Sequence, residues 1–145
     1  ELINKKLGCA VEKGINSIFC IGETAYQRKT GKTFEIIEKQ LCIGLAGLKG
    51  QDLQNISIAY EPVWAIGTGK NATANQIEEA HIFIRNIITD KLFGKEIKPL
   101  TILYGGSVTP QNCKEILANK EVDGALVGTA SLNIDSFCAI ISSAK

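Results

Sequence analysis

The sequence predicts an α/β protein whose strands form a parallel sheet. Short apolar runs rich in strand-forming residues recur along the chain, and each is followed by a longer stretch with apolar residues at helical spacing. Regular alternation of this kind is typical of βα units, and strands that are apolar throughout are typical of parallel sheets. The pattern predicts one helix followed by four βα units. Periodicity alone does not distinguish an open, doubly wound sheet from a closed barrel.

The first predicted helix and strand lie before residue 22. Helical spacing predicts a helix that ends at Gly14, with an apolar stripe formed by Leu2, Ile3, Leu7, Ala10 and Val11. Ser17 to Ile21 is a short apolar run, and we expect it to be a buried strand.

The second helix is predicted after the chain break at Thr30-Gly31-Lys32. We expect Gly47 and Gly50 to close it, and its amphipathic stripe comprises Phe34, Ile37, Leu41, Leu45 and Leu48. Ile56 to Tyr60 is the next apolar run and predicts the second strand.

A capping box predicts the start of the third long helix. Thr73 and Gln76 have the required spacing, and the helix that follows has a stripe formed by Ile77, Ala80, His81, Ile84 and Ile88. His81 is the only histidine, and on this stripe we expect it to be a buried structural residue. Pro99 precedes the third predicted strand, at residues 101–104.

The last two βα units are predicted from weaker signals. Thr109 and Pro110 predict the N-cap and first residue of a helix whose apolar face is formed by Cys113, Ile116 and Leu117. The last strand is expected at residues 124–127. A final helix follows, lined by Phe137, Ile140, Ile141 and Ala144.

The composition is that of an ordinary globular domain. The chain has 145 residues, of which 45% are apolar and 21% charged, with a net charge of +1. These values give no reason to expect binding to nucleic acid or to a membrane. The cysteines are odd in number and widely spaced, so we expect reduced thiols, mostly in the core, in a cytoplasmic protein without a metal site. The sequence begins with Glu1 and has no initiator methionine, so we expect it to be a partial sequence.

The most informative stretch of the chain runs from Ala59 to Lys70. It places Glu61 directly after an apolar run, and the following Pro62 disfavours a helical backbone at Glu61. Trp64 and two glycines follow in a loop of low charge. A carboxylate at a strand end, followed by a glycine-containing loop, is how α/β enzymes present a catalytic base beneath a mobile lid. A Glu-Pro pair alone is equally consistent with a solvated turn.

The whole stretch closely resembles the catalytic loop of the triosephosphate isomerase family. Three further motifs resemble segments of the same family, in the same order: Cys20-Ile21-Gly22-Glu23, Tyr104-Gly105-Gly106-Ser107 and the segment from Leu126 to Leu132. The resemblance implies a TIM (β/α)8 barrel, in which residues 1–145 supply the C-terminal half, strands five to eight and the preceding helix. It also implies a cofactor-free isomerase of triose phosphates, acting in glycolysis and gluconeogenesis as a homodimer.

The resemblance also implies roles for individual residues. Glu61 is the catalytic base, and the lid runs from Pro62 to about Ala72. The residues implied in binding the substrate phosphate are Gly67, Ser107, Gly128 and Thr129. Those implied in the lid and its latch are Pro62, Trp64, Gly69, Tyr104 and Glu23, with Glu23 expected to be structural.

Two departures from the family bear on the expected activity. The usual family pattern has a second glycine where Thr129 stands, and a requirement for positive φ there would strain the threonine and weaken phosphate binding. The family's catalytic lysine and electrophilic histidine belong to segments upstream of Glu1. We therefore expect the 145-residue chain alone to be inactive, and His81 does not replace the missing histidine.

Other readings of the same motifs remain open from the sequence. One is a phosphate-binding half-barrel without catalysis. Another is a different phosphate-using barrel, such as an aldolase or an indole-forming enzyme, although these have no reason to keep the Glu-Pro-Val-Trp motif. A P-loop is excluded, because that pattern requires glycine at position 64 and serine or threonine at position 71. The chain has Trp64 and Asn71 there.

Overall fold

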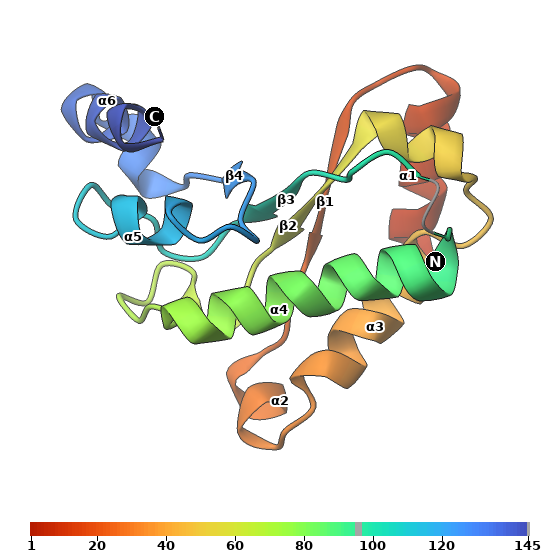
Figure 1. The fold of residues 1–145 in the computed structure, drawn as a ribbon, viewed down its shortest axis with the longest axis horizontal. Helices are drawn as coiled ribbons and strands as arrows, with labels where there is room; N and C mark the ends of the chain where they lie inside the picture. Colours follow the sequence, from red (N-terminus) through yellow and green to blue (C-terminus); the bar gives the residue numbers. More distant parts are fainter. Residues whose placement is uncertain (95–96, 145) are drawn as a thin grey trace.

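The computed structural model describes residues 1–94 and 97–144 and shows a four-stranded parallel sheet (Figure 1). The strands pair in chain order as β1 (Ser17–Ile21), β2 (Ile56–Tyr60), β3 (Ile102–Tyr104) and β4 (Gly124–Ala125). In the register, Ile21 lies beside Tyr60, and Tyr60 lies beside Tyr104. The carboxyl ends of these strands therefore meet at one edge of the sheet. The predicted α/β class with parallel strands is confirmed, and four such strands correspond to half of an eight-stranded barrel.

Helices fill the intervals between the strands, as the alternation predicts. The α-helices are α1 (Leu2–Glu12), α2 (Ala25–Lys29), α3 (Thr33–Gly44), α4 (Ala74–Asn86), α5 (Cys113–Leu117) and α6 (Ile134–Ser143). Four shorter helical segments are η1 (Gly50–Asn55), η2 (Val63–Ala65), the π-helical η3 (Ile87–Leu92) and η4 (Thr129–Leu132). The sequence patterns did not predict α2 or η1, which are too short to show a helical stripe.

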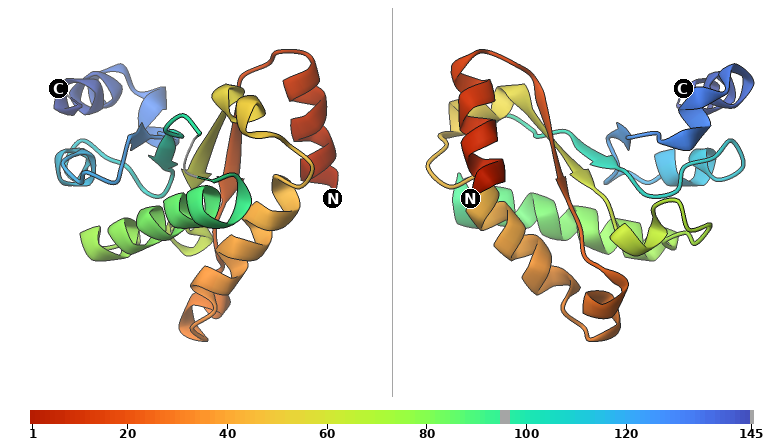
Figure 2. Two further views of the ribbon diagram at one scale, coloured as in Figure 1. Left: turned by 45° about the vertical axis from the view of Figure 1, so that its right-hand side comes forward. Right: turned by 180° about the vertical axis from the view of Figure 1, so that it is seen from behind.

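The helices cover one face of the sheet and leave the other open. Right-handed crossovers between sequential neighbours place every connecting helix on the same side. Figure 2 shows α1 and α3 beside β1, with α4 packed on α3 and β3, and α5 and α6 toward the β4 end of the sheet. In β1, Phe19 and Ile21 are buried, whereas Ile18 is 48% exposed and Cys20 is also exposed. The prediction of a fully buried first strand is therefore wrong, because only one face of β1 is covered.

The core lies between the covered face and the two long helices. Ile37 and Leu41 of α3, Ile84 of α4, and Ile58 and Ile102 of the sheet are completely buried. The predicted capping box is confirmed at the start of α4, where Thr73 and Gln76 bond each other's backbone N–H groups. The helix therefore begins where the sequence predicts, and its buried stripe faces the sheet.

Helix α3 ends earlier than predicted, at Gly44. The Asn4 side chain of α1 donates hydrogen bonds to the carbonyl oxygens of Gly44 and Ala46, at 2.9 and 2.8 Å, and so satisfies the helix terminus. Gly47 then adopts a φ of 79°, which reverses the chain. Leu45 is still buried, so its place in the apolar stripe reflects packing beyond the helix.

Helix α5 of the third βα unit and strand β4 of the fourth are also shorter than predicted. The N-cap of α5 is Asn112, and the expected cap at Thr109 is wrong. The Asn112 side chain instead accepts from the Thr109 N–H at 2.7 Å and donates to the Ser107 carbonyl at 3.0 Å, which holds this segment as a loop. Strand β4 has only two residues, although Leu126 still donates to the Tyr104 carbonyl.

The expected burial of the cysteines and of the last helix is mostly wrong. Among the five cysteines, only Cys113 is buried, while Cys9, Cys20 and Cys138 are exposed. Of the residues expected to line α6, Ile140 is buried, whereas Ile141 is 50% exposed. These side chains lie outside the core of the four-stranded sheet although they are apolar.

Candidate active site

Glu61 follows β2 and is held from both neighbouring strands. Its backbone N–H donates to the carbonyl oxygen of Ile21 at 2.7 Å, and the N–H of Gly105 donates to the Tyr60 carbonyl at 2.8 Å. These bonds continue the parallel ladder beyond the last paired residues. The strand end therefore fixes the backbone of Glu61 between β1 and β3, as expected for a residue that must be placed accurately.

The Glu61 side chain lies over Gly105. A Cβ atom added to Gly105 would stand 2.6 Å from Cγ of Glu61 and 3.0 Å from its Oε1, so this position has room only for glycine. On the other side lies Cys20. Cys20 is exposed on the open face of the sheet, and only part of its surroundings is protein. This partial loss of solvent, and secondly the charge of the Glu61 carboxylate, raise the pKa of the Cys20 thiol to about 11, so the thiol is neutral at pH 7 and able to donate to Glu61.

Glu23 forms the centre of a buried polar cluster beside the loop that follows Glu61. It is fully buried and accepts hydrogen bonds from Trp64 Nε1 at 2.9 Å, from Arg28 at 2.9 Å and from the Tyr60 hydroxyl at 3.1 Å. The Arg28 guanidinium also lies 5.0 Å from the centre of the Trp64 ring. Burial and the Glu23 charge raise the pKa of Tyr60, which keeps its hydroxyl protonated as a donor. All partners of Glu23 are thus donors that stabilise a carboxylate.

The loop expected to be a lid is anchored at both ends and exposed in the middle. Pro62, Ala65 and Ala72 are buried, whereas residues 66–71 are exposed. Gly67 and Gly69 have φ angles of 65° and 73°, a region that side chains disfavour. Trp64 anchors the loop through its indole N–H as well as its ring, which the sequence did not predict.

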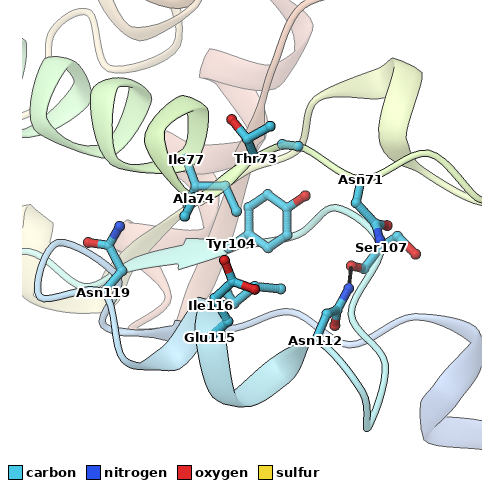
Figure 3. Close-up of a pocket in the computed structure, with 11 residues that line it drawn as sticks. Asn71, Thr73, Ala74, Ile77, Tyr104, Ser107, Asn112, Glu115, Ile116 and Asn119 are labelled. Carbon is cyan, nitrogen blue, oxygen red and sulfur yellow. Dashed lines mark hydrogen bonds between the residues drawn. The ribbon is translucent and has the colours of Figure 1, made fainter.

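Tyr104 and Ser107 lie beside the far end of the loop. Together with Asn71 and Ala72 they line a cavity of about 280 Å³, in which the Tyr104 hydroxyl points toward the residues that end the loop (Figure 3). Burial raises the pKa of Tyr104, and the nearby Ala72 N–H partly offsets the rise. The Ala72 N–H is near the hydroxyl but does not form a hydrogen bond with it, and within the described residues the hydroxyl has no hydrogen-bond partner. The hydroxyl therefore retains its capacity to donate and accept a hydrogen bond.

Gly128 and Thr129 follow β4 at the same edge of the sheet and are exposed. The carbonyl oxygen of Gly128 accepts from both the N–H and the hydroxyl of Ser131, at 2.9 and 2.7 Å, which fixes the turn. No described residue other than glycine has a positive φ. Thr129 is therefore free of the backbone strain that its replacement of glycine could have introduced.

His81 lies in the core behind this edge, with its ring edge-on to that of Tyr60 at 6.1 Å between centroids. It is fully buried, and its Nδ1 lies 3.0 Å from the Glu121 carbonyl oxygen, so Nδ1 is the protonated nitrogen. Burial lowers the pKa of His81 to about 4. The predicted structural placement is confirmed, and the imidazole is neutral at pH 7.

Several residues of the site were not found from the sequence. Tyr60, Arg28 and Asn112 each bond a residue of the predicted site. Arg28 and Asn112 belong to none of the recognised motifs, and Tyr60 lies in the Ala59–Lys70 stretch but was given no role there. Their roles depend on contacts between elements. Among the residues that the structure describes, no cluster of acidic, histidine or cysteine side chains could hold a metal ion, and none of the helices has the length and apolarity needed to cross a membrane.

Comparisons with known proteins agree with the motifs. A family model described as triosephosphate isomerase matches residues 1–144. The chain is similar to the triosephosphate isomerases of Geotalea uraniireducens (strain Rf4), at 48% identity, and Carboxydothermus hydrogenoformans, at 51%. Each match covers 97% of this chain and 56% of the relative, so the chain spans about half the length of these relatives. The extent and identity of these matches show that the chain belongs to the triosephosphate isomerase family.

Proposed function

We propose that this chain carries the catalytic base and lid of an enzyme that interconverts dihydroxyacetone phosphate and D-glyceraldehyde 3-phosphate. The observation that supports this most directly is the placement of Glu61. It lies at the carboxyl edge of a parallel sheet, where barrel enzymes have their active sites, and the anchored loop begins at the next residue.

In the proposed reaction Glu61 moves one proton between adjacent carbons. Its carboxylate removes a proton from the carbon beside the carbonyl group, which gives an enediolate. The resulting carboxylic acid returns a proton to the neighbouring carbon, while protons move between the two oxygens. No electrons enter or leave, so no cofactor is needed. This mechanism is the known one of the family, and it is a standard example of an enzyme that adjusts the pKa values of its catalytic acid and base through their surroundings.

The loop and the other strand ends supply substrate binding in this proposal. Amide groups of Gly67, Ser107, Gly128 and Thr129 hold the phosphate. The loop from Pro62 to Ala72 closes over the substrate and excludes water from Glu61. Loss of water makes the Glu61 carboxylate a stronger base. Trp64 and Gly69 belong to the moving segment. The Tyr104 hydroxyl receives the Ala72 end of the loop, and Glu23 holds the other end through Trp64.

Polarisation of the substrate carbonyl requires groups outside this chain. By resemblance, a lysine and a histidine upstream of Glu1 supply it, and the active unit is the complete barrel in a cytoplasmic homodimer. The enzyme then acts in glycolysis and gluconeogenesis.

The experiment that tests the proposal is an isomerase assay on the complete product of the gene that encodes this chain. We expect conversion of glyceraldehyde 3-phosphate at an enzymatic rate, and a loss of at least about 1000-fold in kcat for Glu61→Gln, since the amide cannot accept the proton. A Glu61→Gln enzyme with undiminished activity would reject Glu61 as the base.

A further inference from the structure

The side-chain amide of Gln40, in α3, forms two hydrogen bonds with the backbone of Gly22, which lies beside the proposed base. Gln40 Nε2 donates to the Gly22 carbonyl oxygen at 3.0 Å, and the Gly22 N–H donates to Gln40 Oε1 at 2.9 Å. Two bonds to the N–H and C=O of one residue fix its position and its orientation. Gly22 follows directly after β1, where the chain leaves the sheet.

Gly22 in turn lies against the backbone of Glu61. A Cβ atom added to Gly22 would stand 1.9 Å from the Glu61 carbonyl oxygen and 2.5 Å from its carbonyl carbon. No positive φ is recorded at Gly22, so the requirement for glycine comes from the closeness of Glu61. A shift of Gly22 toward β2 therefore meets the Glu61 peptide at once.

The residues on either side of Gly22 bond the same region. Ile21 accepts from the Glu61 N–H, and the Glu23 carbonyl accepts from the Val63 N–H at 3.0 Å. Residues 21–23 thus form a backing for residues 61–63, which include the base and the first residues of the loop. Within this backing, Gln40 is the side chain that ties Gly22 to the helical layer.

We propose that Gln40 is a positioning residue for Glu61, acting through the backbone of Gly22. This inference rests on the proposed role of Glu61 as the base. Gln40 does not touch the substrate in this arrangement. Its effect comes from keeping the end of β1 in register with the end of β2, so that the carboxylate is held at the distance that proton abstraction requires.

The test compares two substitutions in the complete gene product. Gln40→Met keeps the length of the side chain and removes both hydrogen bonds. We expect kcat to fall about 10-fold or more while KM changes less than about twofold. The reason is that the substitution displaces the base but leaves the amides that bind the substrate phosphate in place. Lys39→Met, at the adjacent exposed position of α3, serves as the control and is expected to keep the wild-type kcat.

Gln40→Glu adds a signature that a general loss of stability would not produce. The ionised carboxylate accepts from the Gly22 N–H but cannot donate to the Gly22 carbonyl, and protonation restores that donor. We expect kcat relative to wild type to rise as the pH is lowered toward 5 for Gln40→Glu, and to stay level for Gln40→Met. This comparison remains available if Gln40→Met does not fold.

The outcomes separate the inference from the proposed function. A folded Gln40→Met enzyme with kcat within twofold of wild type, or with KM raised as much as kcat is lowered, overturns the positioning role. So does a Gln40→Glu ratio that does not change with pH. If Glu61→Gln is fully active, the proposed function itself fails, and that result is measured independently of Gln40.

Discussion

The accuracy with which Glu61 is placed comes from residues that have little or no side chain. Gly22 lies against its backbone and Gly105 against its side chain, and each would collide with Glu61 if it carried a Cβ atom. Conformational freedom is not the reason for glycine at either position. The space is already taken by Glu61, the residue proposed to act as the base, so both glycines are part of the proposed site although neither contributes a functional group.

Shortening the base tests how much this placement matters. Glu61→Asp retracts the carboxylate by about one methylene, and the strand ends leave the backbone no freedom to follow. We expect kcat to fall on the order of 100- to 1000-fold with little change in KM, measured with glyceraldehyde 3-phosphate on the complete gene product. A decrease smaller than about 10-fold would remove Glu61 from the role of base.

For Thr129 we predict a small effect of substitution, in contrast to the large loss expected for Glu61→Asp. Since it has no positive φ, replacing it by glycine relieves no backbone strain. We expect Thr129→Gly to change both KM and kcat less than about twofold. A clearly lower KM with unchanged kcat would mean instead that the threonine weakens phosphate binding in the ground state.

At the level of elements, the strands were predicted more accurately than the helix ends. β1 and β2 begin and end where their apolar runs do. The reason is that a short apolar run with polar residues or glycine on both sides allows only one position for the ends of the strand. The end of α3 depends on Asn4, which is 40 residues away from Gly44. A contact of that kind has no local signal.

The same distinction applies to the candidate site. Glu61, the loop and the motif at Tyr104 are contiguous in sequence and could be recognised there. Arg28 and Gln40 act on residues of other elements through single hydrogen bonds or pairs of bonds. Their spacing is that of ordinary surface positions on helices, so only the folded arrangement identifies them.

His81, in helix α4, makes the free energy of unfolding depend on pH. The imidazole is buried, its Nδ1 donates to the Glu121 carbonyl, and its Nε2 has no partner among the described residues. Arg85 nearby also disfavours the charged form, whereas Asp123 favours it. Protonation would therefore place a charge on a buried nitrogen without a hydrogen-bond acceptor.

Since the folded-state pKa of about 4 lies below the ordinary value of 6.5, the contribution is fully present above pH 6.5 and is lost as the pH falls toward 4. We expect His81 to account for up to about 3 kcal/mol of unfolding free energy lost over that range. Urea unfolding of the complete gene product and of His81→Gln, which does not titrate, measures the difference. Parallel pH profiles for the two proteins would contradict the assignment.

For the whole molecule, the uncovered face of the sheet is the dominant feature. β1 and β4 are both edge strands, and Ile18 and Cys20 are exposed on the open face. Edges and apolar faces of this kind favour pairing with other chains. Among the described residues are the proposed base and the proposed phosphate-binding amides. The one histidine of the chain, His81, is buried in the core and does not reach a substrate carbonyl.

We therefore expect the isolated 145-residue chain to lack isomerase activity. Removing one electrophilic donor commonly costs 100- to 1000-fold in rate, and here two are proposed to be missing. The measurement is an assay of the purified chain, free of host enzyme, beside the complete gene product. Turnover by the chain alone at an enzymatic rate would show that the upstream groups are not needed.

The pairing of each strand with its neighbour in the chain also bears on how this part of the protein folds. Every pairing in the sheet closes a loop of only one βα unit, and none requires the two ends of the chain to meet. The entropy lost in each closure is modest and is recovered by the packing of the helix within that loop. The sheet can thus grow one unit at a time, so a nascent chain emerging from the ribosome can build it in the order of synthesis.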